Sequence, residues 1–290
     1  MKQPDEGHIP YKNYKTYYKV VGEDTGKPPL LVLHGGPGSA HNYMLALAAL
    51  AEEGRQIVFY DQLGGGISDR PKDDSLWTTT FFVEEVDRVR KHLGLQDIHL
   101  LGHSWGGMLA IEYMLTKPKG VRSITLASAM ISMPLYQTEV EKLKKDLPDR
   151  VYAALIKHET AGTTDSAEYA EAMRVYDARH IFRGKLWPKQ FSSANPAFGD
   201  SYKLMWGASE AYANGRLKKW DKLNQLKEIT IPTLITSGQY DELTPEQALI
   251  TQANIPGSEI KIFTAGSHCA HIEYPEEYVA VVEEFLSKHD

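Results

Sequence analysis

Short apolar runs alternate with longer helical patterns through the first 130 residues of the chain. The runs LLVL at 30–33, IVFY at 57–60, IHLL at 98–101 and ITLA at 124–127 are largely apolar throughout, not only at every second position. Such continuous apolarity is typical of parallel strands that are covered on both faces. The segment 16–21 alternates instead, which indicates a strand near a sheet edge. The spacing between these runs predicts helices over 43–53, 80–93 and 105–116.

The pattern changes at residue 132. From there to residue 226 the apolar residues follow helical spacing and aromatic residues are frequent. Strand-like runs and a final helix then follow at 233–237, 260–263 and 275–288. Because neither flank completes a sheet alone, we expect one α/β fold with a mostly parallel central sheet and helices on both faces. Its core would comprise residues 1–131 and 227–290, and residues 132–226 would form an inserted helical cap.

Composition excludes several classes of protein. The chain has 290 residues, of which 42% are hydrophobic and 24% charged, and its net charge is −6. The chain therefore has no excess of Lys and Arg, which a nucleic-acid-binding protein would be expected to have. No stretch approaches the roughly 18 consecutive apolar residues that a membrane span needs. The beginning, MKQPDEGHIP, has no apolar signal segment, so we expect a cytoplasmic protein without a nucleic-acid or membrane partner. The single cysteine, Cys269, supplies neither an internal disulfide nor a thiolate cluster for zinc.

The sequence GHSWG at 102–106 stands directly after a predicted strand and directly before a predicted helix. A sharp turn at this junction would lift Ser104 out of the sheet as a nucleophile, and Gly102 and Gly106 would relieve the crowding around it. The backbone amide of Trp105 would lie at a helix N-terminus, where it has no partner within the helix and can receive an oxyanion. This context predicts a serine nucleophile.

The sequence HGGPG at 34–38 follows another predicted strand and resembles the loop that completes an oxyanion hole beside such a turn. Glycine lets the backbone approach a substrate closely, so we expect the amide of Gly36 to be the second donor. Pro37 has no N–H and stiffens the loop. A phosphate-binding loop is excluded because no Lys-Ser or Lys-Thr follows the glycines.

A serine nucleophile needs a base and an acid that orients the base, and in this arrangement both come later in the chain. Asp241 and His268 each stand just after one of the last two predicted strands, where loops gather around a ligand. We therefore expect Asp241 to hold His268, and His268 to take the proton of Ser104. His271 is the competing base, and His103 is interpreted as the variable position of the turn.

Three motifs together resemble those of the proline iminopeptidases (prolyl aminopeptidases), α/β-hydrolases of the S33 serine peptidase family: HGGPG at 34–38, DQLGGGIS at 61–68 and GHSWGG at 102–107. The resemblance covers nearly the whole chain. It implies an α/β-hydrolase fold with a helical cap, and release of an N-terminal residue, preferentially proline, through an acyl-enzyme. It also implies short peptide or amino-acid amide substrates with a free N-terminus and no metal or organic cofactor. The oligomeric state is not predicted.

The resemblance further assigns two glutamates to the substrate's α-amino group. Glu242 follows Asp241 directly, and Glu210 ends the stretch WGASE at 206–210 in the cap. Carboxylates would offset the cost of moving an ammonium out of water, and loss of one partner of such a pair costs about 2–5 kcal/mol. The residues that line a proline ring are not fixed, and the candidates are Tyr202, Met205 and Trp206.

Other functions stay open at this point. An amino-acid amidase or esterase of the same family would use the same triad, and a general carboxylesterase would not need Glu210 or Glu242. A ligand-binding receptor on an inactive hydrolase fold is disfavoured because all three triad residues are present. Epoxide hydrolases and haloalkane dehalogenases of this fold need an aspartate where Ser104 stands.

Overall fold

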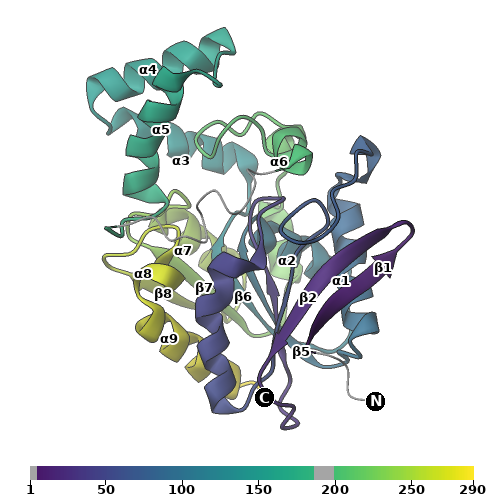
Figure 1. Cartoon of the computed structure of the whole chain (residues 1–290). Coiled ribbons are helices and arrows are strands. Elements are labelled where there is room, and N and C mark those ends of the chain that lie inside the picture. Colours follow the sequence, from purple (N-terminus) through teal and green to yellow (C-terminus); the bar gives the residue numbers. More distant parts are fainter. Residues whose placement is uncertain (1–4, 186–198) are drawn as a thin grey trace.

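The computed structural model describes residues 5–185 and 199–290, and these include one eight-stranded sheet (Figure 1). The strand order is β1-β2-β4-β3-β5-β6-β7-β8. β1 and β2 form an antiparallel hairpin, β2 also pairs antiparallel with β4, and all pairings from β4 through β3 to β8 are parallel. The expected mostly parallel sheet is confirmed. The strands are β1 (Glu6–Tyr11), β2 (Tyr14–Val21), β3 (Leu30–Leu33), β4 (Ile57–Tyr60), β5 (Ile98–Ser104), β6 (Val121–Ala129), β7 (Thr233–Gly238) and β8 (Glu259–Phe263).

The central strands bury both of their faces. In β3, Leu30 and Val32 pack in the apolar cluster shared with η1 and α9, whereas Leu31 and Leu33 pack in the cluster shared with α1 and α2. Successive side chains of a strand point to opposite faces, so a continuous apolar run requires a cover on each side. Helices therefore lie on both faces of the sheet, as expected. The bounds in this core are η1 (His41–Glu53), η2 (Asp74–Leu76), α1 (Thr79–His92), α2 (Trp105–Leu115), η4 (Leu223–Glu228), α7 (Pro245–Asn254), α8 (Ala270–Glu273) and α9 (Pro275–Ser287).

Local sequence explains where the helices begin. The hydroxyl of Thr78 accepts the backbone N–H of Phe81 and so caps α1. Phe82, Val86 and Val89 then follow at helical spacing, and all three are buried. Basic residues end this helix, where they complement its dipole.

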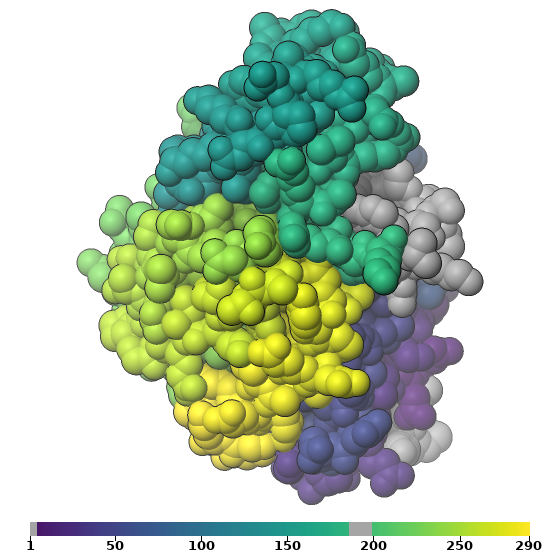
Figure 2. Space-filling view, turned by 90° about the vertical axis from the view of Figure 1, so that its left-hand side faces the viewer, coloured from purple at the N-terminus to yellow at the C-terminus, as the bar shows by residue number. Residues whose placement is uncertain are grey.

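The segment between β6 and β7 in the sequence is helical in most of its described residues. It contains α3 (Met133–Lys145), α4 (Asp149–Ala161), α5 (Ala167–His180), α6 (Asp200–Met205) and η3 (Arg216–Lys219). The two connections to the sheet lie side by side: the N–H of Met133 donates to the Trp220 carbonyl at 2.8 Å, and the N–H of Lys222 donates to the Ile131 carbonyl at 3.0 Å. Figures 1 and 2 show α3, α4 and α5 stacked over the part of the core built from the last third of the chain.

Some elements differ from the sequence-based prediction. The strand β1 was not predicted, because only Ile9 of its six residues is buried and the segment has no clear apolar face. The helix predicted over 43–53 begins earlier, at His41, and is a 3₁₀-helix. Over the ranges that the structure describes, no helix is long and apolar enough to cross a membrane.

Candidate active site

Ser104 lies at the junction of β5 and α2, in a backbone conformation that side chains rarely adopt. Its φ is 58° and its ψ is −122°. Such strain persists only where the surroundings impose it, and it is common at active sites. The flanking glycines are required by close packing: a Cβ at Gly102 would lie 2.2 Å from the Gly106 carbonyl oxygen, and a Cβ at Gly106 would lie 2.1 Å from the Leu33 carbonyl oxygen. The sharp strand-to-helix turn predicted from GHSWG is therefore present.

The HGGPG loop lies beside this turn because β3 is the neighbour of β5, with Leu33 paired to Gly102. A Cβ at Gly35 would come within 3.1 Å of the Ser104 Cβ, so the loop packs directly against Ser104. Gly36 follows with a φ of 115°, a conformation that favours glycine. The loop and the N-terminus of α2 thus bring the amides of Gly36 and Trp105 to the end of the sheet that carries Ser104.

Gln62, which was not singled out from the sequence, braces both halves of this arrangement. Its side-chain amide donates to the His34 carbonyl at 2.8 Å, and its side-chain oxygen accepts the Trp105 indole N–H at 2.8 Å. Its backbone N–H donates to Nε2 of His34 at 2.9 Å. The signal was available, because Gln62 stands in the DQLGGGIS motif just after β4. The glycines of that motif allow tight packing, since a Cβ at Gly66 would lie 2.0 Å from Oδ2 of Asp61.

His268 and Asp241 form a direct pair. Nδ1 of His268 lies 2.9 Å from Oδ1 of Asp241, and both residues are buried. Burial lowers the pKa of His268, but the carboxylates of Asp241, Glu242 and Glu210 outweigh burial and raise that pKa to about 9. The two loops that carry the pair are tied together, because the N–H of Tyr240 donates to the Gly266 carbonyl at 2.9 Å. The structure therefore brings together the two side chains, after β7 and β8, that the sequence analysis proposed as acid and base.

His103 connects this pair to the turn that carries Ser104. Its Nε2 lies 2.9 Å from the His268 carbonyl oxygen, and the two ring centroids are 4.7 Å apart. Ser104 is the next residue, so the contact places the turn of Ser104 against the His268 loop. The competing base, His271, packs against His103 with centroids 4.8 Å apart. Burial first, and then the charge of His268, lowers the pKa of His271 to about 3. The partner of Asp241 is thus His268.

Tyrosines hold the two glutamates. The hydroxyl of Tyr176 donates to Glu242 at 3.3 Å, and the Tyr202 side chain hydrogen-bonds with the Glu210 side chain. The hydroxyl of Tyr136 donates to the backbone carbonyl of Glu210 at 2.8 Å. Helices α3, α5 and α6 therefore each contribute a tyrosine to this acidic site. Of the candidates for a proline pocket, Tyr202 belongs to this site, and Met205 and Trp206 are buried in the apolar core.

Burial and mutual repulsion disfavour the charged forms of Glu210 and Glu242. Desolvation, followed by the charge of Glu210, raises the pKa of Glu242 well above its ordinary value. Desolvation also raises the pKa of Glu210, against the opposing effects of His268 and Tyr202. Two carboxyl groups that ionise reluctantly beside one another would both be stabilised as carboxylates by an ammonium group placed between them.

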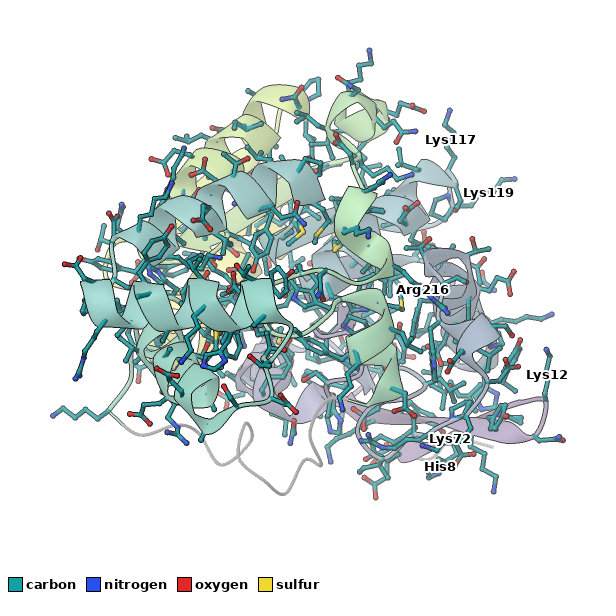
Figure 3. The ribbon with its side chains drawn as sticks, turned by 90° about the horizontal axis from the view of Figure 1, so that it is seen from above. His8, Lys12, Lys72, Lys117, Lys119 and Arg216 are labelled. Carbon is teal, nitrogen blue, oxygen red and sulfur yellow. The ribbon has the colours of Figure 1, made fainter. Side chains whose placement is uncertain are left out.

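Basic residues labelled in Figure 3 lie on the side of the molecule away from the helices α4 and α5. Lys72 pairs with Asp200 at 3.0 Å, and Lys117 pairs with Glu228 at 3.8 Å. These cations therefore balance surface carboxylates and not the two glutamates of the site. Within the described part of the chain, no group of three or more His, Cys, Asp or Glu residues could hold a metal ion.

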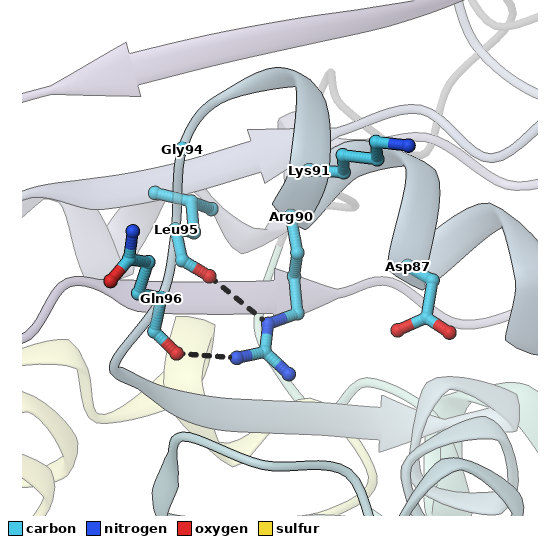
Figure 4. Close-up of a pocket in the computed structure, with 6 residues that line it drawn as sticks. All are labelled: Asp87, Arg90, Lys91, Gly94, Leu95 and Gln96. Atoms are coloured by element: carbon cyan, nitrogen blue, oxygen red, sulfur yellow. Dashed lines mark hydrogen bonds between the residues drawn. The ribbon is translucent and has the colours of Figure 1, made fainter.

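A separate pocket of about 520 Å³ lies at the end of α1 (Figure 4). Arg90 donates from its guanidinium to the carbonyls of Leu95, Gln96 and Lys119, and to the hydroxyl of Tyr113. The protein itself uses these donors, so Arg90 braces the turn before β5. The pocket is lined by Asp87, Arg90, Lys91, Gly94, Leu95 and Gln96, and it shares no residue with the Ser104 site.

Known proteins resemble the chain over almost its whole length. The model of the alpha/beta hydrolase fold family matches residues 28–275. A proline iminopeptidase of Clostridium botulinum is 41% identical over 289 residues, which cover 98% of this chain and 99% of that protein. The crystal structure of a proline iminopeptidase of Mycobacterium smegmatis matches with a TM-score of 0.90 and 36% identity, over 98% of each chain. The crystal structure of VinJ matches with a TM-score of 0.93 and 36% identity, over 98% of this chain and 99% of that one. The chain therefore belongs to the proline iminopeptidase family of α/β-hydrolases.

Proposed function

We propose that the protein is a serine exopeptidase that releases N-terminal proline, or another small N-terminal residue, from peptides through an acyl-enzyme intermediate. The observation that carries the proposal is the Asp241–His268 pair, which His103 holds against the turn of Ser104. Ser104 is the nucleophile and His268 the general base and acid. Asp241 keeps the imidazole in the required tautomer.

The reaction follows from these positions. His268 takes the proton of Ser104 as the hydroxyl oxygen attacks the carbonyl carbon of the first residue. The amides of Gly36 and Trp105 receive the oxyanion, and loss of one such donor typically costs about 2.7–4 kcal/mol. His268 then protonates the leaving amine, the C–N bond breaks, and the acyl-enzyme forms. Water, activated by His268, attacks the ester and releases the amino acid.

The free amino group of the substrate binds to Glu210 and Glu242. Both carboxyl groups are buried, which raises their pKa values, and an ammonium group bound between them would favour their charged forms. The substrates are therefore short peptides or amino-acid amides with a free N-terminus. Binding at this point would set the first carbonyl over Ser104, which accounts for removal of a single residue.

Residues 132–226 form, in this proposal, a helical cap on a core made of residues 1–131 and 227–290. Residues 186–198 of this segment lie outside the described residues. The cap supplies Glu210 and the tyrosines of the amine site, while the core supplies the triad.

The replacement Ser104→Ala tests the nucleophile. The variant should lose hydrolysis of prolyl-β-naphthylamide and labelling by a fluorophosphonate probe. A variant that still cleaves at the parental rate would refute the mechanism. Comparison of Pro-amide, Ala-amide and Pro-Xaa dipeptides by kcat/KM then separates a peptidase from an amino-acid amidase. A general carboxylesterase would instead prefer p-nitrophenyl acetate.

A further inference from the structure

A chain of three hydrogen bonds passes through His103, the residue before Ser104, to the backbone of His268. The backbone N–H of Gly35 donates to the Tyr43 hydroxyl at 2.7 Å. That hydroxyl lies 2.8 Å from Nδ1 of His103, and Nε2 of His103 lies 2.9 Å from the His268 carbonyl oxygen. The chain thus joins the HGGPG loop after β3, the end of β5 and the loop after β8. Each of these segments carries one part of the proposed catalytic machinery.

Only one arrangement of protons satisfies all three bonds. A carbonyl oxygen accepts and cannot donate, so Nε2 of His103 carries the hydrogen directed at His268. Nδ1 of the neutral ring then accepts the proton of Tyr43, whose oxygen in turn accepts the N–H of Gly35. Burial, reinforced by the charges of His268 and His271, lowers the pKa of His103 well below its ordinary value. A neutral ring is the form that this chain of bonds requires.

The surroundings leave these groups little freedom. Tyr43 is 5% exposed and His103 is 2% exposed. A Cβ at Gly35 would lie 2.9 Å from the Tyr43 oxygen, so the loop is packed directly on the hydroxyl. The His268 backbone is held from both sides, because its own N–H donates to the His180 carbonyl at the end of α5, at 3.0 Å.

We propose that Tyr43 and His103 are positioning residues that set the oxyanion loop and the catalytic histidine relative to each other. Neither residue contacts the substrate in this account. Tyr43 fixes the peptide group between His34 and Gly35, one residue before Gly36, and His103 fixes the backbone of His268. The inference rests on the proposed roles of Ser104 and His268, and it adds two side chains to that mechanism.

Tyr43→Phe tests the chain, since it keeps the ring and removes only the hydroxyl. We expect kcat on prolyl-β-naphthylamide to fall by roughly 10–100-fold, because small misplacements of reacting groups have effects of that size. KM should stay within about twofold, because Glu210 and Glu242 are untouched. Labelling of Ser104 by a fluorophosphonate should slow in parallel.

Tyr278→Phe is the matched control. Tyr278 is also buried, its ring packs against His271 with centroids 5.8 Å apart, and its hydroxyl bonds with Thr236 at 2.9 Å. This replacement also removes one buried hydroxyl but leaves the chain from Gly35 to His268 intact. Its kcat should stay within about twofold of the parental value.

His103 offers a rescue test with a second pair of variants. His103→Leu removes both hydrogen bonds, whereas the carboxamide of His103→Gln keeps a donor for the His268 carbonyl. We expect the Gln variant to retain clearly more of kcat than the Leu variant. Any of three results would overturn the proposal. These are a parental kcat in Tyr43→Phe, equal losses of kcat in Tyr43→Phe and Tyr278→Phe, and equal losses of kcat in the two His103 variants. In those cases loss of activity in Ser104→Ala would still stand, so failure of the chain is distinguishable from failure of the mechanism.

Discussion

Oδ1 of Asp241 lies 2.9 Å from Nδ1 of His268 and also accepts the backbone N–H of Leu243 at 2.9 Å. The second bond ties the carboxyl group to its own loop, and this holds Oδ1 of Asp241 in place beside the imidazole. The pair is buried, which shields it from water and strengthens the interaction.

Asp241→Asn should lower kcat on prolyl-β-naphthylamide by about 10⁴-fold, as loss of the acid does in other triads. The amide keeps the shape of the carboxyl group but no longer stabilises the imidazolium. Steady-state kinetics with the purified variant provide the measurement. Asp97→Asn is the control, because Asp97 pairs with Arg122 at the surface, and its kcat should not change. If Asp241→Asn kept the parental kcat, Asp241 would not be the acid of the triad.

The pH dependence of kcat/KM reports ionisations of the free enzyme. Burial lowers the pKa of His268, and the neighbouring carboxylates raise it to about 9. An imidazolium cannot accept the serine proton, so kcat/KM should rise with pH and reach its midpoint near that value. Glu242→Gln removes a negative charge and should move the midpoint to lower pH. The exposed Glu246, replaced by Gln, should leave the midpoint in place. A midpoint that is unchanged or higher in Glu242→Gln contradicts the assigned electrostatics.

Glu210→Gln should impair only substrates that carry a free amine. Loss of one partner of a buried charged pair costs about 2–5 kcal/mol, which corresponds to a decrease of roughly 30-fold or more in kcat/KM. p-Nitrophenyl acetate has no amine to lose, and loss of the Glu210 charge lowers the pKa of the general base His268, so hydrolysis of this ester should not fall below the parental rate. Equal losses on both substrates would assign Glu210 to the integrity of the fold and not to recognition.

Glu85 should make stability depend on pH. It is buried, accepts the Thr16 hydroxyl at 2.6 Å and accepts the backbone N–H of Leu63 at 3.1 Å. Burial outweighs these bonds and raises the pKa of Glu85 to about 7. Because the pKa of Glu85 is higher in the folded protein than in the unfolded chain, its protonated form stabilises the folded state. This stabilisation is fully present below the unfolded-state pKa and is lost as pH rises through about 7.

Glu85→Gln stays neutral, so its free energy of unfolding relative to the parent should rise by about 2 kcal/mol between pH 5 and pH 8. Denaturant titrations at the two pH values provide the measurement. The next-door exposed residue Glu84, replaced by Gln, should show no such difference. A Glu85→Gln protein with the same relative stability at both pH values would show that Glu85 is ionised in the folded state throughout this range.

Much of the fold follows from local sequence. Strands such as β4 are apolar throughout because both faces are buried, and that pattern is visible without any partner. The turn at Ser104 is equally local, since its glycines are needed within a few residues of it. β1 was not predicted because it is stabilised by pairing with β2, and Ile9 is its only buried residue.

The contacts around His268 could not be predicted from local sequence. Tyr43 and His103 are 60 positions apart, and His103 and His268 are 165 apart. Neither residue belongs to a pattern that predicts a hydrogen bond over such a separation. Glu210 and Glu242 were assigned only through the family resemblance, because a glutamate in a helical or loop segment is ordinarily a solvated residue.

The most direct measurement is hydrolysis of prolyl-β-naphthylamide by the purified protein, compared with its N-acetylated counterpart at equal concentration. The account predicts rapid release of naphthylamine from the free-amine compound and almost none from the acetylated one, because acetylation removes the charge that Glu210 and Glu242 bind. Equal rates on the two compounds, or cleavage of the acetylated compound alone, would contradict it.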